Sequence, residues 1–353
     1  MRNPFVAESG TYKTTYSKDM TMHRTTGQLV RMILFVTLLY LLPVIISNYA
    51  VGIITLGLIA SIGAIGLNIL TGYTGQISIG VGAFLGVGGY TAAILTSTVG
   101  LSFWVSLPLA GVSTALAGGL FGIPSLRLRG LYLAIATLAA QVVILFVITH
   151  WVSLTGGTAG MTLSRPAIGS FKFSSNTSYY YLTLTILILT TLYATNLFRT
   201  RAGRAFLAVR DRDMAAQIMG INLFGYKVLA FAISSFFVGI AGALLAHYTM
   251  IVSPEFYSID VSIEYLAMIL VGGLGSVLGS ILGAFFITLL PVGLDVGINF
   301  ASEFFPHLYQ KLSAFKELSF GLAIILFLIF EPGGLAQIWH NIRNYFKLWP
   351  FSH

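Results

Sequence analysis

Few side chains in this chain could carry out covalent or metal chemistry. The sequence contains no cysteine, which excludes disulfides, thiolate metal sites and cysteine nucleophiles together. No glycine is followed by lysine, so the phosphate-binding loop of nucleotide hydrolases is absent. There is no HExxH zinc pattern and no constellation typical of nucleophilic catalysis. We therefore predict that the chain is not an enzyme, and that it binds no metal or cofactor of its own.

Ionisable side chains are also scarce within the long apolar stretches. Pumps and ion-coupled carriers usually keep such groups at membrane depth, as proton or ion sites. Here His150, His247, Glu264 and Asp295 lie near the ends of apolar stretches. An interfacial or loop-facing role is the ordinary interpretation, and a position along a permeation path is the alternative. The pattern argues against a stand-alone secondary transporter, which stays open as the second class of function.

The composition indicates a membrane protein. Charged residues make up 8% and hydrophobic residues 56% of the 353-residue chain, whereas soluble domains carry about 25% charged residues. Met32–Leu126 contains no Asp, Glu, Lys or Arg, and one helical span takes about 20 residues. Because lipid cannot satisfy free backbone groups, the spans must be helices. We predict an all-α polytopic protein surrounded by membrane lipid, and we expect no nucleic-acid partner despite the net charge of +8.

Apolar segments predict about ten transmembrane helices inside a permease-like domain at residues 30–331. The expected spans are Val30–Ser47, Val51–Leu70, Ser78–Ser97, Phe103–Ile123, Leu131–Trp151, Tyr179–Leu197, Val228–Met250, Val261–Leu274, Val277–Val296 and Leu318–Phe330. Glycines interrupt Tyr265–Leu294, which could instead be one broken helix and would then give nine spans. Residues 1–29 are predicted to form a disordered cytoplasmic tail, and residues 332–353 an amphipathic cytoplasmic tail.

The distribution of positive charge sets the expected orientation. With ten spans and a cytoplasmic N-terminus, most Lys and Arg residues fall inside. The exceptions are Arg165, Lys172, Lys311 and Lys316. With nine spans, Arg343 and Lys347 would fall outside as well. We therefore expect ten spans with both termini in the cytoplasm.

Two glycine-rich segments are predicted to interrupt the helices. Asn68–Tyr90 is dense in glycine, with a turn expected at Thr71–Gly75, and a second break is expected at Gly272–Gly275. Such breaks commonly line the substrate site in transporters. The candidate residues of a translocation path are Asn68, Gly72, Gly75, Gln76, Gln141, Gly272, Gly273 and Gly275. For the three amide side chains among them, a hydrogen bond between helices is the alternative role.

The most charged part of the chain is the loop at residues 198–227. Arg204–Met219 is rich in helix formers, and Asn222 and Gly225 end that helical pattern. Apolar residues are interleaved with Arg and Asp along it. The segment is either a solvated loop that satisfies the positive-inside rule or a short helix that docks a soluble partner.

Several motifs along the chain have recognisable spacing. Ala215-Ala216-x-x-x-Gly220 resembles the EAA-type signature of permease subunits, with Met214 at the position of the glutamate, a departure common to one branch. The other motifs are Gly220-Ile221-Asn222 with Tyr226-Lys227 and Ala230-Phe231, Gly66–Phe84, Gly272–Ser276 and Phe330–Leu335. Together they resemble the LivM-type permease subunits of branched-chain amino acid ABC importers, and the resemblance extends from about Ala50 to Trp339.

This resemblance implies a subunit of a bacterial inner-membrane importer. Its partners would be a second, homologous permease subunit, two ATP-binding subunits that hold the ATP, and a periplasmic substrate-binding protein. The helix at residues 204–220 would enter a groove on the ATPase, and the outer loops at residues 152–178 and 251–260 would receive the binding protein. The ATPase-coupling residues would be Arg204, Arg210, Asp211, Asp213, Ala215, Ala216, Gly220 and Asn222. Urea, short amides and other amino acids stay open as substrates beside branched-chain amino acids.

Overall fold

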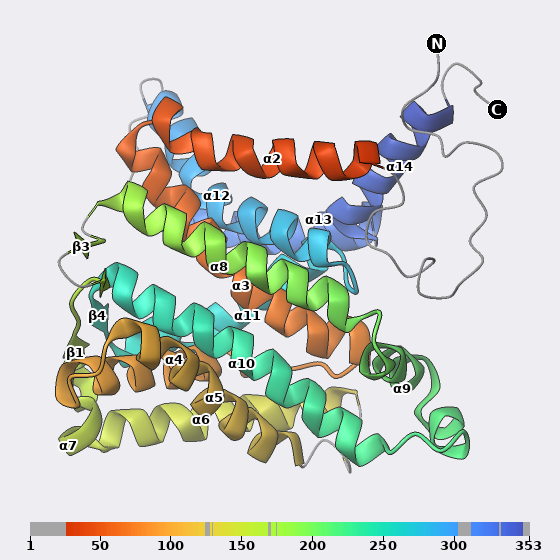
Figure 1. Cartoon of the computed structure of the whole chain (residues 1–353), viewed down its shortest axis with the longest axis horizontal. Helices are drawn as coiled ribbons and strands as arrows, with labels where there is room; N and C mark the ends of the chain where they lie inside the picture. Colours follow the sequence, from red (N-terminus) through yellow and green to blue (C-terminus); the bar gives the residue numbers. More distant parts are fainter. Residues whose placement is uncertain are drawn as a thin grey trace.

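The long helices lie side by side along the longest axis of the molecule (Figure 1). The computed structural model describes residues 26–123, 128, 130–168, 171–173, 175–302, 312–331 and 333–348. Within them, seven helices are long and apolar enough to cross a membrane. They are α3 (Asn48–Thr74), α4 (Val81–Ala93) with its π-helical continuation η1 (Ile94–Thr98), α5 (Phe103–Gly122), α6 (Leu131–His150), α8 (Asn176–Leu197), α10 (Leu223–Thr249) and α12 (Val277–Ser302). The chain is therefore a mostly helical, multi-pass membrane protein, as its sequence predicts.

Shorter or less apolar elements complete the structure. The helices are α2 (Thr26–Ile45), α7 (Val152–Thr155), η3 (Gly157–Ala159), α9 (Arg201–Ile218), η4 (Pro254–Tyr257), α11 (Ile259–Gly272), α13 (Leu312–Phe330) and α14 (Gly334–Leu348). Strands β1 (Met161–Thr162) and β4 (Ile251–Val252) pair antiparallel, as do β2 (Ala167–Ile168) and β3 (Phe171–Lys172). Each of the ten predicted segments overlaps a helix, but α2, α11 and α13 are not among the seven candidate spans. A total of ten spans and cytoplasmic termini therefore stay predictions, and residues 1–25 lie outside the described part.

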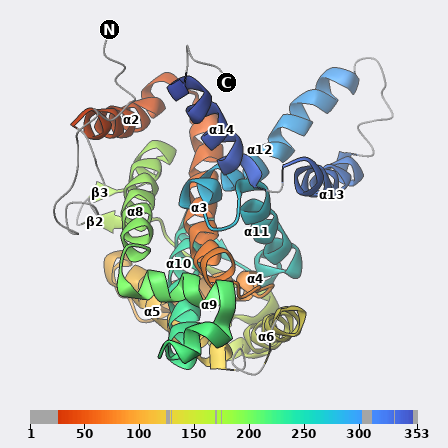
Figure 2. The same cartoon turned by 90° about the vertical axis from the view of Figure 1, so that its right-hand side faces the viewer.

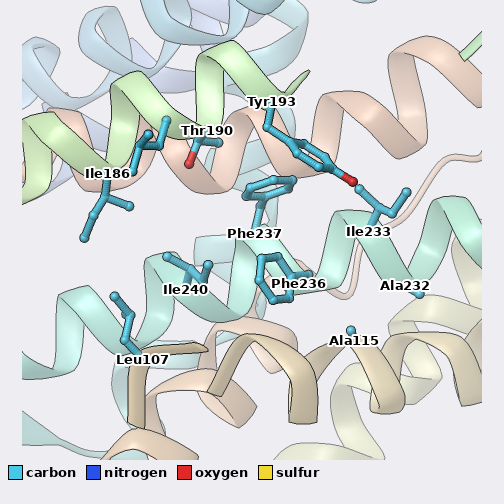
Figure 3. Close-up of a pocket in the computed structure, with 11 residues that line it drawn as sticks. Leu107, Ala115, Ile186, Thr190, Tyr193, Ala232, Ile233, Phe236, Phe237 and Ile240 are labelled. Carbon is cyan, nitrogen blue, oxygen red and sulfur yellow. The ribbon is translucent and has the colours of Figure 1, made fainter. Parts of the chain in front are cut away.

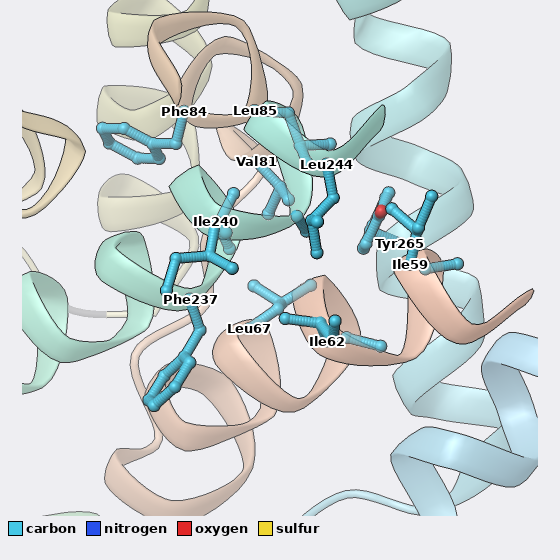
Figure 4. Close-up of a cluster of buried hydrophobic side chains, with 14 of the residues drawn as sticks. Ile59, Ile62, Leu67, Val81, Phe84, Leu85, Phe237, Ile240, Leu244 and Tyr265 are labelled. Atoms are coloured by element: carbon cyan, nitrogen blue, oxygen red, sulfur yellow. The ribbon is translucent and has the colours of Figure 1, made fainter. Parts of the chain in front are cut away.

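Helix α3 lies at the centre of the bundle, with α4, α8, α10 and α11 around it (Figure 2). It is apolar on all sides and almost wholly buried beyond its first turns, as expected of a helix enclosed by other helices. Its small residues allow close approach: a Cβ at Gly66 would lie 2.8 Å from the Ser234 carbonyl oxygen of α10. Figure 4 shows the resulting core, in which Ile62 and Leu67 of α3 meet side chains of α4, α10 and α11.

Helices α11 and α12 form a tightly packed hairpin. A Cβ at Gly272 would overlap the carbonyl oxygen of Gly279, and a Cβ at Gly283 would overlap that of Met268. Gly272 thus pairs with Gly279, and Met268 pairs with Gly283. Residue numbers fall along α11 as they rise along α12, so the two helices are antiparallel. Tyr265–Leu294 is thus divided between two helices. Its glycines Gly272, Gly279 and Gly283 form the contact between them.

Gly283→Ala is expected to destabilise the protein, because a methyl group would force the backbones of α11 and α12 apart. Overpacking of this kind costs about 1–3 kcal/mol. Gly293→Ala is the matched control in the same helix, since no atom of the described residues lies within 4 Å of a Cβ there. Thermal unfolding of the detergent-purified variants should show a lower midpoint for Gly283→Ala only. Equal midpoints would contradict the close packing of the hairpin.

Candidate functional site

Asn68 joins the first glycine-rich segment to the second. Its Nδ2 donates to the carbonyl oxygen of Ser276 at 2.9 Å and to the Ser280 Oγ at 2.6 Å. Its Oδ1 accepts from the backbone N–H of Gly275 at 2.9 Å. The side chain is 1% exposed, so these bonds form away from solvent. A Cβ at Gly72 would overlap the Asn68 Oδ1 and the Gly275 nitrogen, and glycine at that position therefore permits the contact.

The turn that we expected at Thr71–Gly75 is helical up to Thr74. Only Gly75 leaves the helix, with φ of +69° in the left-handed region that glycine adopts without strain. The next residue, Gln76, is buried, and its Nε2 donates to the Thr74 Oγ1 at 3.0 Å. The Thr74 hydroxyl itself donates to the Leu70 carbonyl. The Gln76 Oε1 therefore faces away from Thr74, and it has no partner among the described residues.

The loop at residues 198–227 contains the helix α9, which is the second of the two alternatives that its sequence left open. This helix has two parts. Thr200 caps its start, where the Oγ1 accepts from the Gly203 N–H at 3.3 Å. Arg212 has φ of −155° and ψ of 99°, which is extended backbone and divides the helix at that residue. Phe206 and Val209 in the first part are buried, whereas the second part is mostly exposed. Figure 1 shows α9 at the right-hand end of α3 and α8.

The first part of α9 contacts the end of α3 through Arg210. The Arg210 Nη1 donates to the Gly72 carbonyl oxygen at 3.0 Å, and its Nε contacts the Asp211 Oδ1 at 3.2 Å. Beyond the kink, Asp213 lies 3.8 Å from the Nζ of Lys227, which is buried in the first turns of α10. The segments before and after the kink therefore contact different helices: Arg210 contacts α3, and Asp213 contacts α10.

The remaining predicted coupling residues lie along or just after α9. Arg204 donates to the Arg199 carbonyl at 3.0 Å, which closes the first turn. Ala215 is exposed and Ala216 is buried. Gly220 has φ of +85° and ends the helix. Asn222 begins the next one, because its Oδ1 accepts from the Gly225 N–H at 3.1 Å as the N-cap of α10.

A polar cavity of about 210 Å³ lies between α9 and the α3–α4 connection. Gln76, Arg212, Asp213 and Lys227 contribute to its lining. A larger cavity of about 640 Å³ lies between α5, α8 and α10 and is lined by apolar side chains with Thr190 and Tyr193 (Figure 3). Among the described residues, no charged side chain lines the larger cavity, so it offers only the neutral hydroxyl groups of Thr190 and Tyr193 to an ammonium or carboxylate group.

Gln141 lies apart from this cluster and caps the start of α4. Its Oε1 accepts from the Ala83 N–H at 2.7 Å, and its Nε2 donates to the Tyr257 carbonyl oxygen at 2.7 Å. Ser262 of α11 accepts from the Gly82 N–H at 2.8 Å and donates to the same Gln141 oxygen at 3.1 Å. Gln141 therefore makes the hydrogen bonds between helices that were the alternative to a role in the path.

Gly272 and Gly273 end α11 beside the turn that follows α13. Gly273 has φ of +115°, and a Cβ there would lie 2.6 Å from the Gly333 carbonyl oxygen. Gly333 and Gly334 of this motif therefore pack on the second glycine break. Of the eight predicted path residues, the structure gathers five with Arg210: Asn68, Gly72, Gly75, Gln76 and Gly275.

The sequence reasoning missed Ser280 and the inward position of Lys227. Ser280 follows Ser276 by one helical turn, and this spacing on a glycine-flanked helix is a signal that could have found it. Lys227 was counted only as a positive charge in a loop. The structure buries it against Asp213, and no local pattern predicts that contact between two helices.

The two predicted outer loops meet at the end opposite α9 (Figure 1). β1 pairs with β4, and the Leu163 N–H donates to the Met250 carbonyl at 2.8 Å. The ring Nδ1 of buried His247 lies 3.0 Å from the Ser164 carbonyl oxygen. Residues 161–164 and 250–252 therefore form one surface, and His247 helps to hold it.

Comparison with known proteins agrees with the sequence motifs. Residues 49–330 match a family described as the permease component of branched-chain amino acid transport systems. The chain is 32% identical over 320 residues to the high-affinity branched-chain amino acid transport system permease protein LivM of Salmonella typhimurium, covering 84% of this chain and 72% of the relative. It is 32% identical over 340 residues to LivM of Escherichia coli, covering 88% and 76%. A probable LivH permease of Methanocaldococcus jannaschii is 29% identical over 223 residues, covering 60% and 69%. No solved structure matches the chain.

Asn68→Leu is expected to loosen the second glycine break, because it leaves the Gly275 N–H without its acceptor. It also removes one donor to the Ser276 carbonyl, which keeps its bonds from Ser280. Each unsatisfied buried group costs about 1–3 kcal/mol. Hydrogen exchange of peptides that contain residues 273–280 should become faster, and the unfolding temperature should fall. Asn341→Leu, on the exposed side of α14, is the matched control. Unchanged exchange in Asn68→Leu would mean that Asn68 does not hold the break.

Proposed function

Because the chain belongs to the family of permease components of branched-chain amino acid transport systems, we propose that it is one transmembrane subunit of an ATP-driven importer in the bacterial inner membrane. The substrates are branched-chain or related hydrophobic amino acids. Two separate ATP-binding subunits bind and hydrolyse the ATP, and α9 receives their movement. A periplasmic binding protein delivers the substrate.

The observation that carries the proposal is an exposed apolar surface on the second part of α9. Met214, Ile218 and Met219 are 66%, 87% and 83% exposed. Three large apolar side chains at an aqueous surface are unfavourable unless another protein covers them. Ala215 and Gly220, which leave room for close approach, flank them. We propose that a groove of an ATPase subunit covers this surface, which is defined by Met214, Ile218 and Met219 and which we call the docking surface.

The opposite end of the molecule supports delivery by a binding protein. The β1–β4 pair joins the loops at residues 152–178 and 251–260 into one surface. Loops held on a rigid scaffold commonly carry recognition. This surface is at the far end of the bundle from the docking surface (Figure 1), as delivery on one side and ATP hydrolysis on the other require.

A second permease subunit completes the path. The relatives of this chain include both LivM and LivH proteins, which supports pairing with a homologous but different chain. Exposed apolar side chains cover α2 and the α12–α13 region, among them Leu34, Leu289 and Ile325. In Figure 2 these helices project from the central bundle. Their faces are available to lipid and to the second subunit.

Reconstitution tests the proposed function. Proteoliposomes with both permease subunits, the ATPase subunits and the binding protein should take up leucine only when ATP is supplied to the ATPase side. The chain alone should catalyse no uptake driven by a proton or sodium gradient. Gradient-driven uptake by the chain alone would contradict the importer assignment and support a secondary transporter.

Ile218→Asp is expected to separate the ATPase subunits from the permease, because it buries a charge in an apolar interface. Loss of a central apolar contact at an interface costs about 2 kcal/mol or more, so the ATPase should no longer co-purify with the permease. Ile342→Asp, an exposed isoleucine on α14, is the matched control. Equal co-purification of both variants would rule out the docking surface, whereas membrane insertion should be normal in each.

A further inference from the structure

We propose that Arg210 is a positioning residue that fixes the first part of α9 to both glycine turns, so that movement of α9 reaches α3, α11 and α12 together. The inference rests on the proposed function, because that function supplies the ATPase that moves α9. It gives Arg210 a role within this chain, whereas the resemblance to the importer family implied a contact with the ATPase.

The connectivity of the chain makes such a link necessary. α9 is joined directly only to α8, which ends at Leu197, and to α10, which begins at Leu223. A movement of α9 therefore passes through the backbone to those two helices alone. The glycine turns belong to α3 and to the α11–α12 hairpin, which are distant in sequence. A force on α9 reaches them only through contacts between side chains and backbone.

The Arg210 side chain lies between the two turns. Its Nη1 donates to the Gly72 carbonyl oxygen at 3.0 Å. A Cβ at Gly75 would lie 3.1 Å from the Arg210 Cγ, and a Cβ at Gly275 would lie 3.3 Å from its Nη1. Both glycines also have positive φ, +69° and +77°, which disfavours any other residue there. At both turns the backbone is left-handed, and the absence of a glycine side chain leaves the space that the arginine fills.

The chemistry of a helix end explains why a guanidinium belongs at this point. The last four carbonyl groups of α3 have no partner further along the helix, and a helix C-terminus carries partial negative charge. The N–H of Gln76, which could continue the ladder to Gly72, instead donates to the Leu70 carbonyl at 3.2 Å. The Gly72 carbonyl is thus free to accept from Arg210. Asp211, in contact with the Arg210 Nε, helps to orient the guanidinium.

Asn68 continues the link from α3 to the second turn. It lies one helical turn before Gly72 and holds Gly275, Ser276 and Ser280 by three hydrogen bonds. Arg210 and Asn68 together therefore connect α9, the end of α3 and the start of α12. The kink at Arg212 separates this link from the docking surface, so one helix can be attached to the membrane core and still present a free face to a partner.

The test uses the complete importer in proteoliposomes, with Arg210→Met and Arg210→Lys in this chain. Arg201→Met, at the exposed start of the same helix, is the matched control. Arg210→Met should keep the ATPase subunits bound and hydrolysing ATP, but leucine taken up per ATP should fall about tenfold, the order of effect of losing one hydrogen bond to a charged group. Arg210→Lys keeps a cationic donor and should restore part of the ratio. Arg201→Met should behave as the parent does.

The absence of cysteine in this chain permits a second measurement, in which this chain carries no native cysteine that could be labelled. Spin labels on cysteines at Ala208 and Leu278 report the distance between α9 and the start of α12. In the parent this distance should be the same in nucleotide-free and ATP-trapped importer, because the two segments move together. In Arg210→Met it should differ between the two states.

The outcomes distinguish the link from the proposed function itself. An unchanged uptake-to-ATP ratio in Arg210→Met, or label distances that do not respond to the substitution, would overturn the link. Loss of ATPase binding in Arg210→Met would also overturn it, because Arg210 would then be a docking contact. A parent complex that shows no ATP-dependent uptake would refute the proposed function and not this inference alone. If Arg210→Met does not fold, Arg210→Ala, which also lacks a donor, replaces it and is judged by the same criteria.

Discussion

The structure depends on one constraint: a backbone that leaves its helix inside a membrane must find hydrogen-bond partners within the protein. Each glycine break creates such groups. At the second break, the Asn68 side chain accepts from the N–H of Gly275 and donates to the carbonyl oxygen of Ser276. At the end of α3, Arg210 donates a hydrogen bond to the carbonyl oxygen of Gly72. The breaks are therefore tolerated because helices from elsewhere in the chain deliver a polar side chain to each.

The start of α4 shows the same solution with different residues. The first N–H groups of a helix have no partner within it. Here the Ile79 N–H donates to the Thr137 Oγ1 at 2.9 Å, Gly82 to Ser262, and Ala83 to Gln141. In many transporters such a helix start faces an anionic group of the substrate. Those donors are already occupied in this chain, so the start of α4 serves to join α4, α6 and α11.

The sequence predicts the parts of the structure that follow from composition and local pattern. Absence of charge over Met32–Leu126 is enough to assign membrane helices, whereas the charge and helix formers of loop 198–227 leave a solvated loop and a short helix both open. The glycine density at Asn68–Tyr90 predicts a break but not its position, because Thr71–Thr74 stay helical and only Gly75 turns. Contacts such as Asn68 with Ser280 join residues far apart in the chain, and no local periodicity encodes them. The resemblance to the importer family identified α9 correctly as a helix, but it could not indicate that Arg210 points toward the glycine turns.

The hydrogen bonds that these polar side chains already form also limit how the chain can bind a substrate. Among the described residues near the breaks, Asn68, Gln141 and Ser262 already form hydrogen bonds within the chain, whereas the Gln76 Oε1 has none. A zwitterion passing this region would meet few free polar groups, since Arg210 and Lys227 already contact Gly72, Asp211 and Asp213, and it would bind weakly. Weak binding favours passage, but it cannot select leucine from other amino acids by itself. On the proposed function, direction and selectivity come from outside the path: from the protein that delivers the substrate, and from movements of α9 that change the packing of the glycine turns.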